Sequence, residues 1–415
     1  MVAVFADTDN AIIIFMVLLL GSVTHLIEQN GGINGFVQLM TEKRSIIGSR
    51  KAAQFFTWIM GLLVFTSGTL STLLTGAIAR PLNDALKVSH EKAAFIVHST
   101  STPVCVLIPL SGWGAFMIGL IKAQDIPNAT EVLVQSIPLN FYAIITVFII
   151  PLIIFSGKDW GPMARAEKRA KALGELDEPG KGYSLHTEKA KALPVSSFWN
   201  MLIPIAAMLI VILGGLIITG KGSILQGDGI KAIMWGVIIT LLIIAIQVKT
   251  QRLMTMGEFG HKLVNGAGPM LTVAFILVLA FSMGSLVQTL GTGQFLAAKL
   301  HNFVSAAFLP AIIFLVAAII SFSTGSSMGT MAVVMPLAMP LAMTLGVASA
   351  LAAAAVFSGS IFGDHGSPIS DTTIMSCSTT GCDVMDHIKT QLPYALVFAA
   401  FAALFYLFAG FLTQI

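Results

Sequence analysis

Two acidic side chains lie well inside apolar stretches of this sequence. They are Asp364 and Asp371, in the run Gly-Asp-His-Gly-Ser-Pro-Ile-Ser-Asp-Thr-Thr at 363–373. A carboxylate within a membrane costs at least about 2.5–3.5 kcal/mol on insertion scales, so an acidic residue there is a functional candidate by default. Carboxylate oxygens bind Na⁺ or a proton, and the pair therefore predicts a cation site. The structural alternative is that both residues only cap the ends of half-helices.

The residues around the two carboxylates add neutral ligands. Hard cations such as Na⁺ prefer oxygen, and hydroxyls offer it together with the backbone carbonyls freed by Pro368. The candidate hydroxyls are Ser367, Ser370, Thr372 and Thr373. His365 directly follows Asp364 and is a candidate proton carrier, because histidine changes charge near physiological pH. The alternative role for His365 is a hydrogen-bonded residue at a helix break.

Three other polar clusters are expected to complete this site. Their members are Ser67 and Thr69; His98, Ser99, Thr100, Ser101 and Thr102; and Ser323, Thr324 and Ser326. The first and third clusters contain glycine, which permits close backbone approach, and we expect them at the tips of hairpins. Packing of small residues between helices is the alternative explanation, since it uses the same residue types.

Composition limits the class of protein that these clusters belong to. Of 415 residues, 56% are hydrophobic and only 10% are charged, against about a quarter in ordinary soluble domains. A soluble enzyme, a secreted disulfide scaffold and a disordered chain are therefore excluded. The formal net charge of +3 forms no basic patch for nucleic acid, and the three cysteines show no metal-binding spacing. The chain is predicted to be a polytopic membrane protein.

Six stretches are long and apolar enough to cross a bilayer, which takes about 20 residues of helix. They are 11–29, 132–155, 198–218, 230–248, 270–290 and 392–412. Four further stretches contain polar breaks, and these are 52–82, 93–121, 303–345 and 350–380. Such breaks at membrane depth are tolerated only where they line a cavity or are buried in protein, as in the discontinuous helices of transporters. We expect 52–82 and 303–345 to be re-entrant hairpins and the other two to be broken helices.

The two halves of the chain resemble each other. Ser, Thr, Ala and Pro-Leu recur in register between 71–82 and 326–337, and each half has the order helix, hairpin, broken helix, helix. We expect an all-α fold of inverted repeats. The expected division is a first transmembrane repeat over 1–155, a cytoplasmic linker over 156–197 with a short surface helix near 163–176, and two further helices plus the second repeat over 198–415.

Lys and Arg in the loops predict the orientation, since cytoplasmic loops are enriched in them. If 52–82 returns to its own side, most basic residues fall on one side, in the loops 30–51, 83–92, 156–196, 249–264 and 381–391. The opposite loops, at 122–130, 220–229, 291–302 and 345–348, hold few. The basic side is then the cytoplasm, and the two hairpins enter from opposite sides. The expected location is the cytoplasmic membrane.

The run at 363–374 closely resembles the signature of the NhaC-type Na⁺/H⁺ antiporter family, within the wider ion transporter superfamily. Residues 99–106, preceded by Arg80-Pro81-Leu82, and residues 323–330 resemble two further family motifs. The resemblance extends from about residue 11 onward. It implies an inverted-repeat fold with two hairpins and two broken helices, and sodium-coupled secondary transport. The wider family also contains sodium-coupled carriers of organic acids and amino acids.

The sequence departs from the family pattern in its first half. Family members typically carry an Asp-Asp-Tyr-Phe-Asn-like run at the first hairpin tip, where this chain has Ser-Gly-Thr-Leu-Ser at 67–71. They typically carry Asp at the position of His98. The resemblance also implies a pair of N-terminal helices that would match 198–248 and that does not appear ahead of residue 11. The loss of first-half carboxylates weakens the expectation of a plain Na⁺/H⁺ exchanger.

The sequence therefore predicts an alternating-access secondary transporter of Na⁺ and H⁺, with Asp364 and Asp371 as its cation ligands and no resident cofactor. A Na⁺-coupled carrier of an amino acid or small carboxylate is the first alternative. An ion channel is another, because loops that re-enter from both sides also occur in channels. An enzyme is not expected, since no nucleophile–base pair or metal-ligand constellation is present. Whether the chain forms a homodimer stays open.

Overall fold

The computed structural model describes residues 2–35, 38, 48–65, 67–108, 111–126, 128–178, 196–224, 226–291, 295 and 305–412. All regular secondary structure within these ranges is helical. Seven helices there are long and apolar enough to cross a membrane, and two more pairs of helices qualify when each pair is taken together. The described part of the chain thus holds seven to nine candidate spans, which confirms the prediction of an all-helical polytopic membrane protein.

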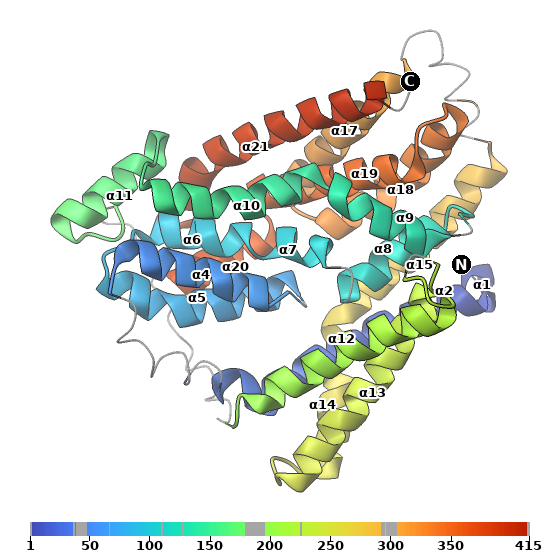
Figure 1. The fold of residues 1–415 in the computed structure, drawn as a ribbon, viewed down its shortest axis with the longest axis horizontal. Helices are drawn as coiled ribbons and strands as arrows, with labels where there is room; N and C mark the ends of the chain where they lie inside the picture. The colour runs from blue at the N-terminus through green and yellow to red at the C-terminus, as the bar shows by residue number, and fades with distance from the viewer. Residues whose placement is uncertain are drawn as a thin grey trace. The chain divides into compact units, whose positions relative to one another are not determined.

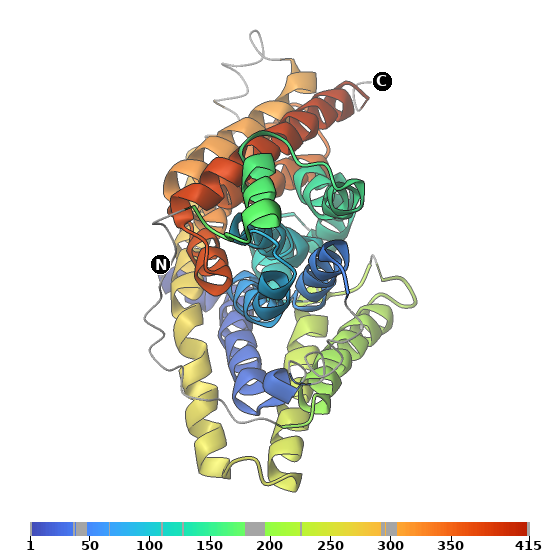
Figure 2. The ribbon, with the colours of Figure 1, turned by 90° about the vertical axis from the view of Figure 1, so that its left-hand side faces the viewer.

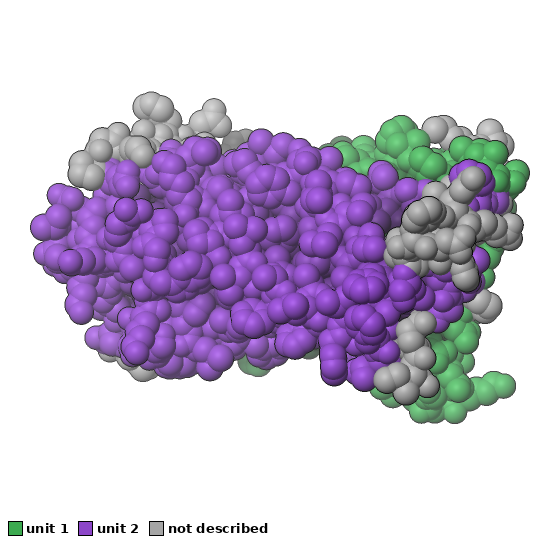
Figure 3. Space-filling model, turned by 90° about the horizontal axis from the view of Figure 1, so that it is seen from above, with its two compact units in different colours: residues 1–43, 109–135, 189–290 green, residues 44–108, 136–188, 291–415 purple. Residues whose placement is uncertain are grey.

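The chain divides into two compact units, which Figure 3 colours separately. Unit 1 comprises residues 1–43, 109–135 and 189–290, and unit 2 comprises residues 44–108, 136–188 and 291–415. Each unit therefore combines segments from both halves of the sequence. Every candidate site residue named above belongs to unit 2.

Unit 1 is built around a single apolar helix. Its helices are α1 (Val2–Ala6), α2 (Thr8–Gln29), α8 (Gly112–Lys122), α9 (Ala129–Ser136, whose last residue belongs to unit 2), α12 (Trp199–Thr219), α13 (Gly229–Thr250), α14 (Met256–Ala267), η3 (Gly268–Met270) and α15 (Leu271–Thr289). Helix α2 packs against α8, α12, α13, α14 and α15, and α12 and α13 run side by side (Figure 1). Buried polar contacts join these helices, including Asn30 Nδ2 to the carbonyl of Asn200 at 2.9 Å and Ser22 Oγ to the carbonyl of Leu263 at 2.7 Å.

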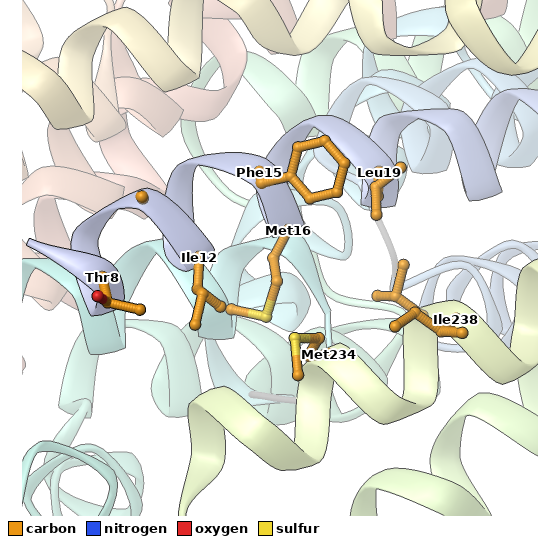
Figure 4. A pocket seen from close by; sticks show the side chains of 9 residues that line it. Thr8, Ile12, Phe15, Met16, Leu19, Met234 and Ile238 are labelled. Carbon is orange, nitrogen blue, oxygen red and sulfur yellow. The ribbon is translucent and has the colours of Figure 1, made fainter. Parts of the chain in front are cut away.

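A pocket in unit 1 lies between α2 and α13 (Figure 4). Its lining residues are Thr8, Ala11, Ile12, Phe15, Met16, Leu19, Met234, Val237 and Ile238. All but Thr8 are apolar, so this lining offers no set of ligands for an ion.

Unit 2 contains the stretches expected to form the two hairpins and the residues expected to break the other two helices. Its helices are α4 (Arg50–Leu63), α5 (Gly68–Ala85), α6 (His90–Ser99), α7 (Thr102–Leu107), η2 (Ile137–Leu139), α10 (Phe141–Ser156), α11 (Gly161–Leu173), η4 (Ala306–Phe308), α17 (Leu309–Thr324), α18 (Ser327–Thr344), α19 (Ser349–Gly366), α20 (Asp371–Thr380) and α21 (Val384–Leu412). In Figure 1, α21 runs alongside α17. Helix α19 is buried along nearly its whole length and packs against α17, α18, α10 and α21.

Local sequence explains where the helices of unit 2 stop. Ser67 and Ser326 cap the N-termini of α5 and α18, as each side chain accepts a backbone N–H of the first turn. Gly325 ends α17 with a φ of +65°, which favours glycine. Helix α6 ends at Ser99 and α7 begins at Thr102, while α19 ends at Gly366 and α20 begins at Asp371. Helical structure is thus interrupted near both predicted breaks, at the second a few residues later than expected.

Buried ion pairs fix the start of α6. Lys92, which is 1% exposed, bonds Asp159 at 2.5 Å, and Glu91 bonds Arg169 at 2.7 Å. Glu167 accepts both from Arg50 and from the backbone N–H of Ser89, the residue that caps α6. The helix expected near 163–176 is thus present as α11, and it packs against α6 and α21 (Figure 2).

Three sequence expectations need correction. The stretch 132–155 is not one uninterrupted helix, because α9 passes into η2, which contains Pro138, before α10 begins. The expected loop 249–264 contains the start of α14, whose N-terminus forms a capping box between Thr255 and Glu258. The expected loop 381–391 contains the start of α21, where Asp383 accepts the backbone N–H groups of two residues in the first turn. In the last two cases the helix begins at polar residues that hydropathy assigned to loops.

Candidate functional site

The carboxylate of Asp364 lies at the end of α19 and is 2% exposed. Ser370 Oγ donates a hydrogen bond of 2.6 Å to its Oδ1, while Ser327 Oγ and Thr372 Oγ1 lie 3.4 and 3.5 Å from its Oδ2. No ion pair to Asp364 occurs within the described ranges. An unpaired buried charge is strongly unfavourable, so this carboxylate is set up to take a cation or a proton.

The turn between α19 and α20 places Ser370 and Thr372 beside Asp364, while its hydroxyls at Ser367 and Thr373 bond the backbone of the turn. Thr373 Oγ1 donates to the carbonyl of Ser367 at 2.8 Å, and Ser367 Oγ in turn accepts the backbone N–H of Ile369 at 3.4 Å. Gly325 lies against the backbone of Ile369 and Ser370, where a Cβ would meet atoms at 2.9–3.0 Å. The tip of the second hairpin and the second break are therefore in direct contact.

Asp371 has different surroundings. It is the first residue of α20 and is exposed. Its Oδ1 accepts the backbone N–H of Thr372 at 2.9 Å, and its Oδ2 lies 3.4 Å from Thr69 Oγ1 at the start of α5. This contact joins the first hairpin to the second break, but it leaves the Asp371 carboxylate largely open.

Three buried histidines, His98, His365 and His387, gather beside the Asp364 cluster. His98 is fully buried at the end of α6, with Nε2 3.1 Å from Thr372 Oγ1 and with its ring centroid 4.6 Å from that of His365. His365 Nε2 lies 3.2 Å from Ser99 Oγ, and its Nδ1 lies 2.7 Å from the Tyr142 hydroxyl. The first and second breaks thus meet through His98, Ser99, His365 and Thr372, as the sequence suggested.

Other predicted hydroxyls serve the backbone instead. Thr100 donates to the carbonyl of Ile96 and Ser101 to that of His98. Ser323 and Thr324 are exposed and bond within their own hairpin, and Ser67 and Ser326 are the helix caps described above. Thr102 is buried with no hydrogen-bond partner among the described residues, and it lies beside Gly68.

Sequence reasoning missed three members of this cluster. Tyr142 contacts His365, and His387 and Gln391 contact His98. His387 and Gln391 are four residues apart and therefore share one face of a helix. That spacing was the available signal, but it lay in a segment expected to be a loop. Tyr142 stands in an apolar run that gives no sign of a polar partner.

Three proteins are similar to this chain in sequence. An uncharacterized protein of Haemophilus influenzae is 30% identical over 98% of this chain and 80% of its own length. A malate-2H⁺/Na⁺-lactate antiporter of Bacillus subtilis is 28% identical over 37% of this chain, and an arginine/ornithine antiporter of Halobacterium salinarum is 23% identical over 52%. The matches span only 33% and 43% of those two antiporters.

Two solved structures share the fold. The YdaH transporter of Alcanivorax borkumensis aligns with a TM-score of 0.60 at 15% identity, covering 99% of this chain and 87% of that one. MtrF of Neisseria gonorrhoeae, from a class of antimetabolite efflux pumps, aligns with a TM-score of 0.59 at 14% identity, covering 94% and 80%. A model of the Na⁺/H⁺ antiporter family matches residues 104–411. Since this match covers most of the sequence, including both carboxylates and the second break, the chain belongs to the Na⁺/H⁺ antiporter family.

Proposed function

We propose that this secondary transporter exchanges Na⁺ for H⁺ across the cytoplasmic membrane by alternating access. The observation that carries the proposal is the buried Asp364 carboxylate, which has hydroxyl neighbours and no ion-pair partner in the described ranges. A site that carries one negative charge and only neutral ligands binds one positive charge at a time. An exchanger of two monovalent cations requires at least such a site, at which the two cations compete.

The proposed cation ligands are the carboxylate of Asp364 and the hydroxyl oxygens of Ser327, Ser370 and Thr372. Oxygen ligands suit a hard cation such as Na⁺. Asp371 lies across the turn between α19 and α20 and is exposed. We therefore assign it to the mouth of the site, where its charge attracts cations.

We further propose that the two halves of the chain are inverted repeats, over 1–155 and 198–415, joined by a cytoplasmic linker over 156–197. The pairing of α4 with α5 and of α17 with α18, each followed by a broken helix, supports this proposal. The excess of Lys and Arg in the loops assigned to one side supports placing that side in the cytoplasm.

A second candidate function is Na⁺-coupled transport of an amino acid or a small carboxylate. Two relatives bear the names of a malate-2H⁺/Na⁺-lactate antiporter and an arginine/ornithine antiporter. The observation that favours it here is the first break, which carries imidazole and hydroxyl groups and no carboxylate. Uptake of such a solute, driven uphill by a Na⁺ gradient, would separate this function from simple cation exchange.

The test uses purified protein in liposomes with an imposed Na⁺ gradient and a pH-sensitive dye inside. We expect Na⁺-driven proton movement by the wild-type chain and its loss, to the level of protein-free vesicles, in Asp364→Asn. The matched control is Asp383→Asn, an aspartate that caps α21 through backbone N–H groups, because asparagine caps a helix equally well.

Two results would contradict the proposal. Full Na⁺-dependent activity in a folded Asp364→Asn variant would show that the cation binds elsewhere. Wild-type protein that moves no protons, yet accumulates an amino acid or carboxylate when Na⁺ is supplied, would favour the second candidate function. A carrier must change conformation for every ion that it moves. Currents larger than such a cycle allows would instead indicate an ion channel.

A further inference from the structure

The imidazole rings of His98 and His387 contact each other within unit 2. His98 Nδ1 lies 3.2 Å from His387 Nε2, and both side chains are fully buried. The other nitrogen of His387, Nδ1, is buried and has no hydrogen-bond partner among the described residues. A buried polar atom without a partner is energetically costly, so this nitrogen calls for a functional explanation.

Gln391 fixes the protonation pattern of the pair. Its Nε2 donates to the backbone carbonyl of His365, so this end of the amide is the NH₂ group. The same nitrogen lies 3.0 Å from His98 Nδ1, which must therefore accept. His98 then carries its hydrogen on Nε2 and donates it to Thr372 Oγ1.

The pattern at His98 determines that at His387. Because His98 Nδ1 has no hydrogen to offer, only His387 Nε2 can donate in the contact at 3.2 Å, where it shares the Nδ1 lone pair with the Gln391 amide. The neutral ring carries one hydrogen only, so His387 Nδ1 is a bare lone pair. It is a buried base with its acceptor site open.

We propose that His387 Nδ1 is the proton-binding atom of this transporter, so that the proton and the Na⁺ ion occupy separate, adjacent sites. The inference rests on the proposed exchange of Na⁺ for H⁺. One proton adds to the Nδ1 lone pair and no bond breaks, which gives an imidazolium that still donates from Nε2 to His98. The proton leaves the same atom when the site faces the other side of the membrane.

A continuous hydrogen-bonded chain links the two sites. From His98 it runs through Thr372 Oγ1 to Ser370 Oγ at 2.9 Å and on to Asp364 Oδ1 at 2.6 Å. The cluster thus holds one negative charge and takes up one positive charge, from the His387 imidazolium or from Na⁺. Both together would leave an excess positive charge at low dielectric, where repulsion is strong. This exclusion couples the two ions.

The remaining titratable groups near His387 fit this assignment. His98 on α6 contacts it directly, and His365 on α19 packs against the other side of the His98 contact network. Tyr142 on α10 bonds His365, and Asp364 lies beyond Thr372. Charged residues on the two helices that carry this pair are already paired. Asp386 contacts Lys389 on α21, and Glu91 and Lys92 at the far end of α6 bond Arg169 and Asp159. Asp364 is therefore the buried carboxylate that balances the imidazolium.

The test compares two transport modes in the same liposomes: exchange of ²²Na⁺ for Na⁺, which needs no proton, and Na⁺-driven proton movement. His387→Gln keeps an amide donor toward His98 but cannot be protonated. We expect it to retain ²²Na⁺ exchange and to lose proton movement to the level of protein-free vesicles. Asp364→Asn should lose both modes. His261→Gln, an exposed histidine on α14, is the matched control and should lose neither.

Two outcomes overturn the inference. If the His387→Gln variant still moves protons, the proton binds elsewhere. If the variant folds but loses both transport modes, His387 belongs to the cation site. Wild-type protein that moves no protons would instead contradict the proposed function itself. If the His387→Gln variant does not fold, ¹⁵N NMR of wild-type protein labelled in histidine tests the assignment instead. Adding Na⁺ should convert one imidazolium to a neutral ring. No change in any histidine signal refutes the assignment.

Discussion

The two breaks of unit 2 share an element order but differ in what their hydroxyls do. At the end of α6, Thr100 and Ser101 donate to carbonyls of that helix, and the groups that reach the second break are the His98 imidazole and the Ser99 hydroxyl. After α19, Ser370 and Thr372 direct their hydroxyls at each other and at a carboxylate. The difference teaches that a Ser/Thr-rich break is not by itself an ion site. The break also needs a charge that its hydroxyls can surround.

The largest effect is expected from moving that charge between the breaks. In the double variant Asp364→Asn/His98→Asp a carboxylate stands in the first break, where it faces Thr372, Gln391 and His387 but not Ser327 or Ser370. We expect ²²Na⁺ uptake to stay at the level of protein-free vesicles. Recovery of uptake in the double variant, but not in Asp364→Asn alone, would make the two breaks interchangeable.

A second large effect concerns the close packing of glycines next to each break. A Cβ at Gly363 of α19 would collide with the backbone of α17 at Phe322, whereas Gly61 of α4 faces the side chain of Thr100. Backbone cannot move aside as a side chain can, so we expect Gly363→Ala to destabilise the protein by about 1–3 kcal/mol or more. Thermal unfolding in detergent measures it, with Gly260→Ala as the control in open space. Equal melting temperatures would refute the close packing.

A matched pair of serines tests the roles of the hydroxyls. Ser370→Ala removes the 2.6 Å hydrogen bond to Asp364, whereas Ser101→Ala removes only a bond to a backbone carbonyl. Hydrogen bonds to charged groups contribute about 1.5–3 kcal/mol. We therefore expect Ser370→Ala to change the half-saturating Na⁺ concentration roughly ten- to hundredfold, and Ser101→Ala to leave it nearly unchanged. Similar shifts for both serines would remove the distinction between the breaks.

The smallest effect is expected at the exposed carboxylate. Asn in place of Asp371 can still accept the backbone N–H of Thr372, and exposed substitutions usually change free energies by no more than about 0.5 kcal/mol. Asp371→Asn should therefore shift the half-saturating Na⁺ concentration only about twofold. A loss as complete as that in Asp364→Asn would show that Asp371 is itself a ligand.

Sequence reasoning identified most of the architecture because each signal is local. Apolar runs of sufficient length give the spans. Helix ends are marked locally by the capping residues Ser67 and Ser326, by Gly325, and by Pro103 in the first turn of α7. The acidic residues of the second break stand out because carboxylates are rare in such runs. The family resemblance rested on the same local runs.

The segments that misled sequence reasoning were helix starts built from polar residues. Residues 384–391 are as polar as a loop, but Asp383 caps the helix and neighbouring helices bury it. Burial by neighbours is a property of the tertiary structure, and hydropathy over a short window cannot detect it. The same holds for Tyr142, whose hydroxyl finds a partner more than 200 residues away.

The sequence by itself determined that this protein is a helical membrane protein with polar breaks and a rare pair of carboxylates. Only the tertiary structure decided which of those groups are buried together. It separated Asp364 from the exposed Asp371, and it brought His387 and Gln391 against His98 from almost 300 residues away. The physical reason is that helix ends and apolar spans depend on near neighbours along the chain. The surroundings of a charge depend on helices that the sequence does not place side by side.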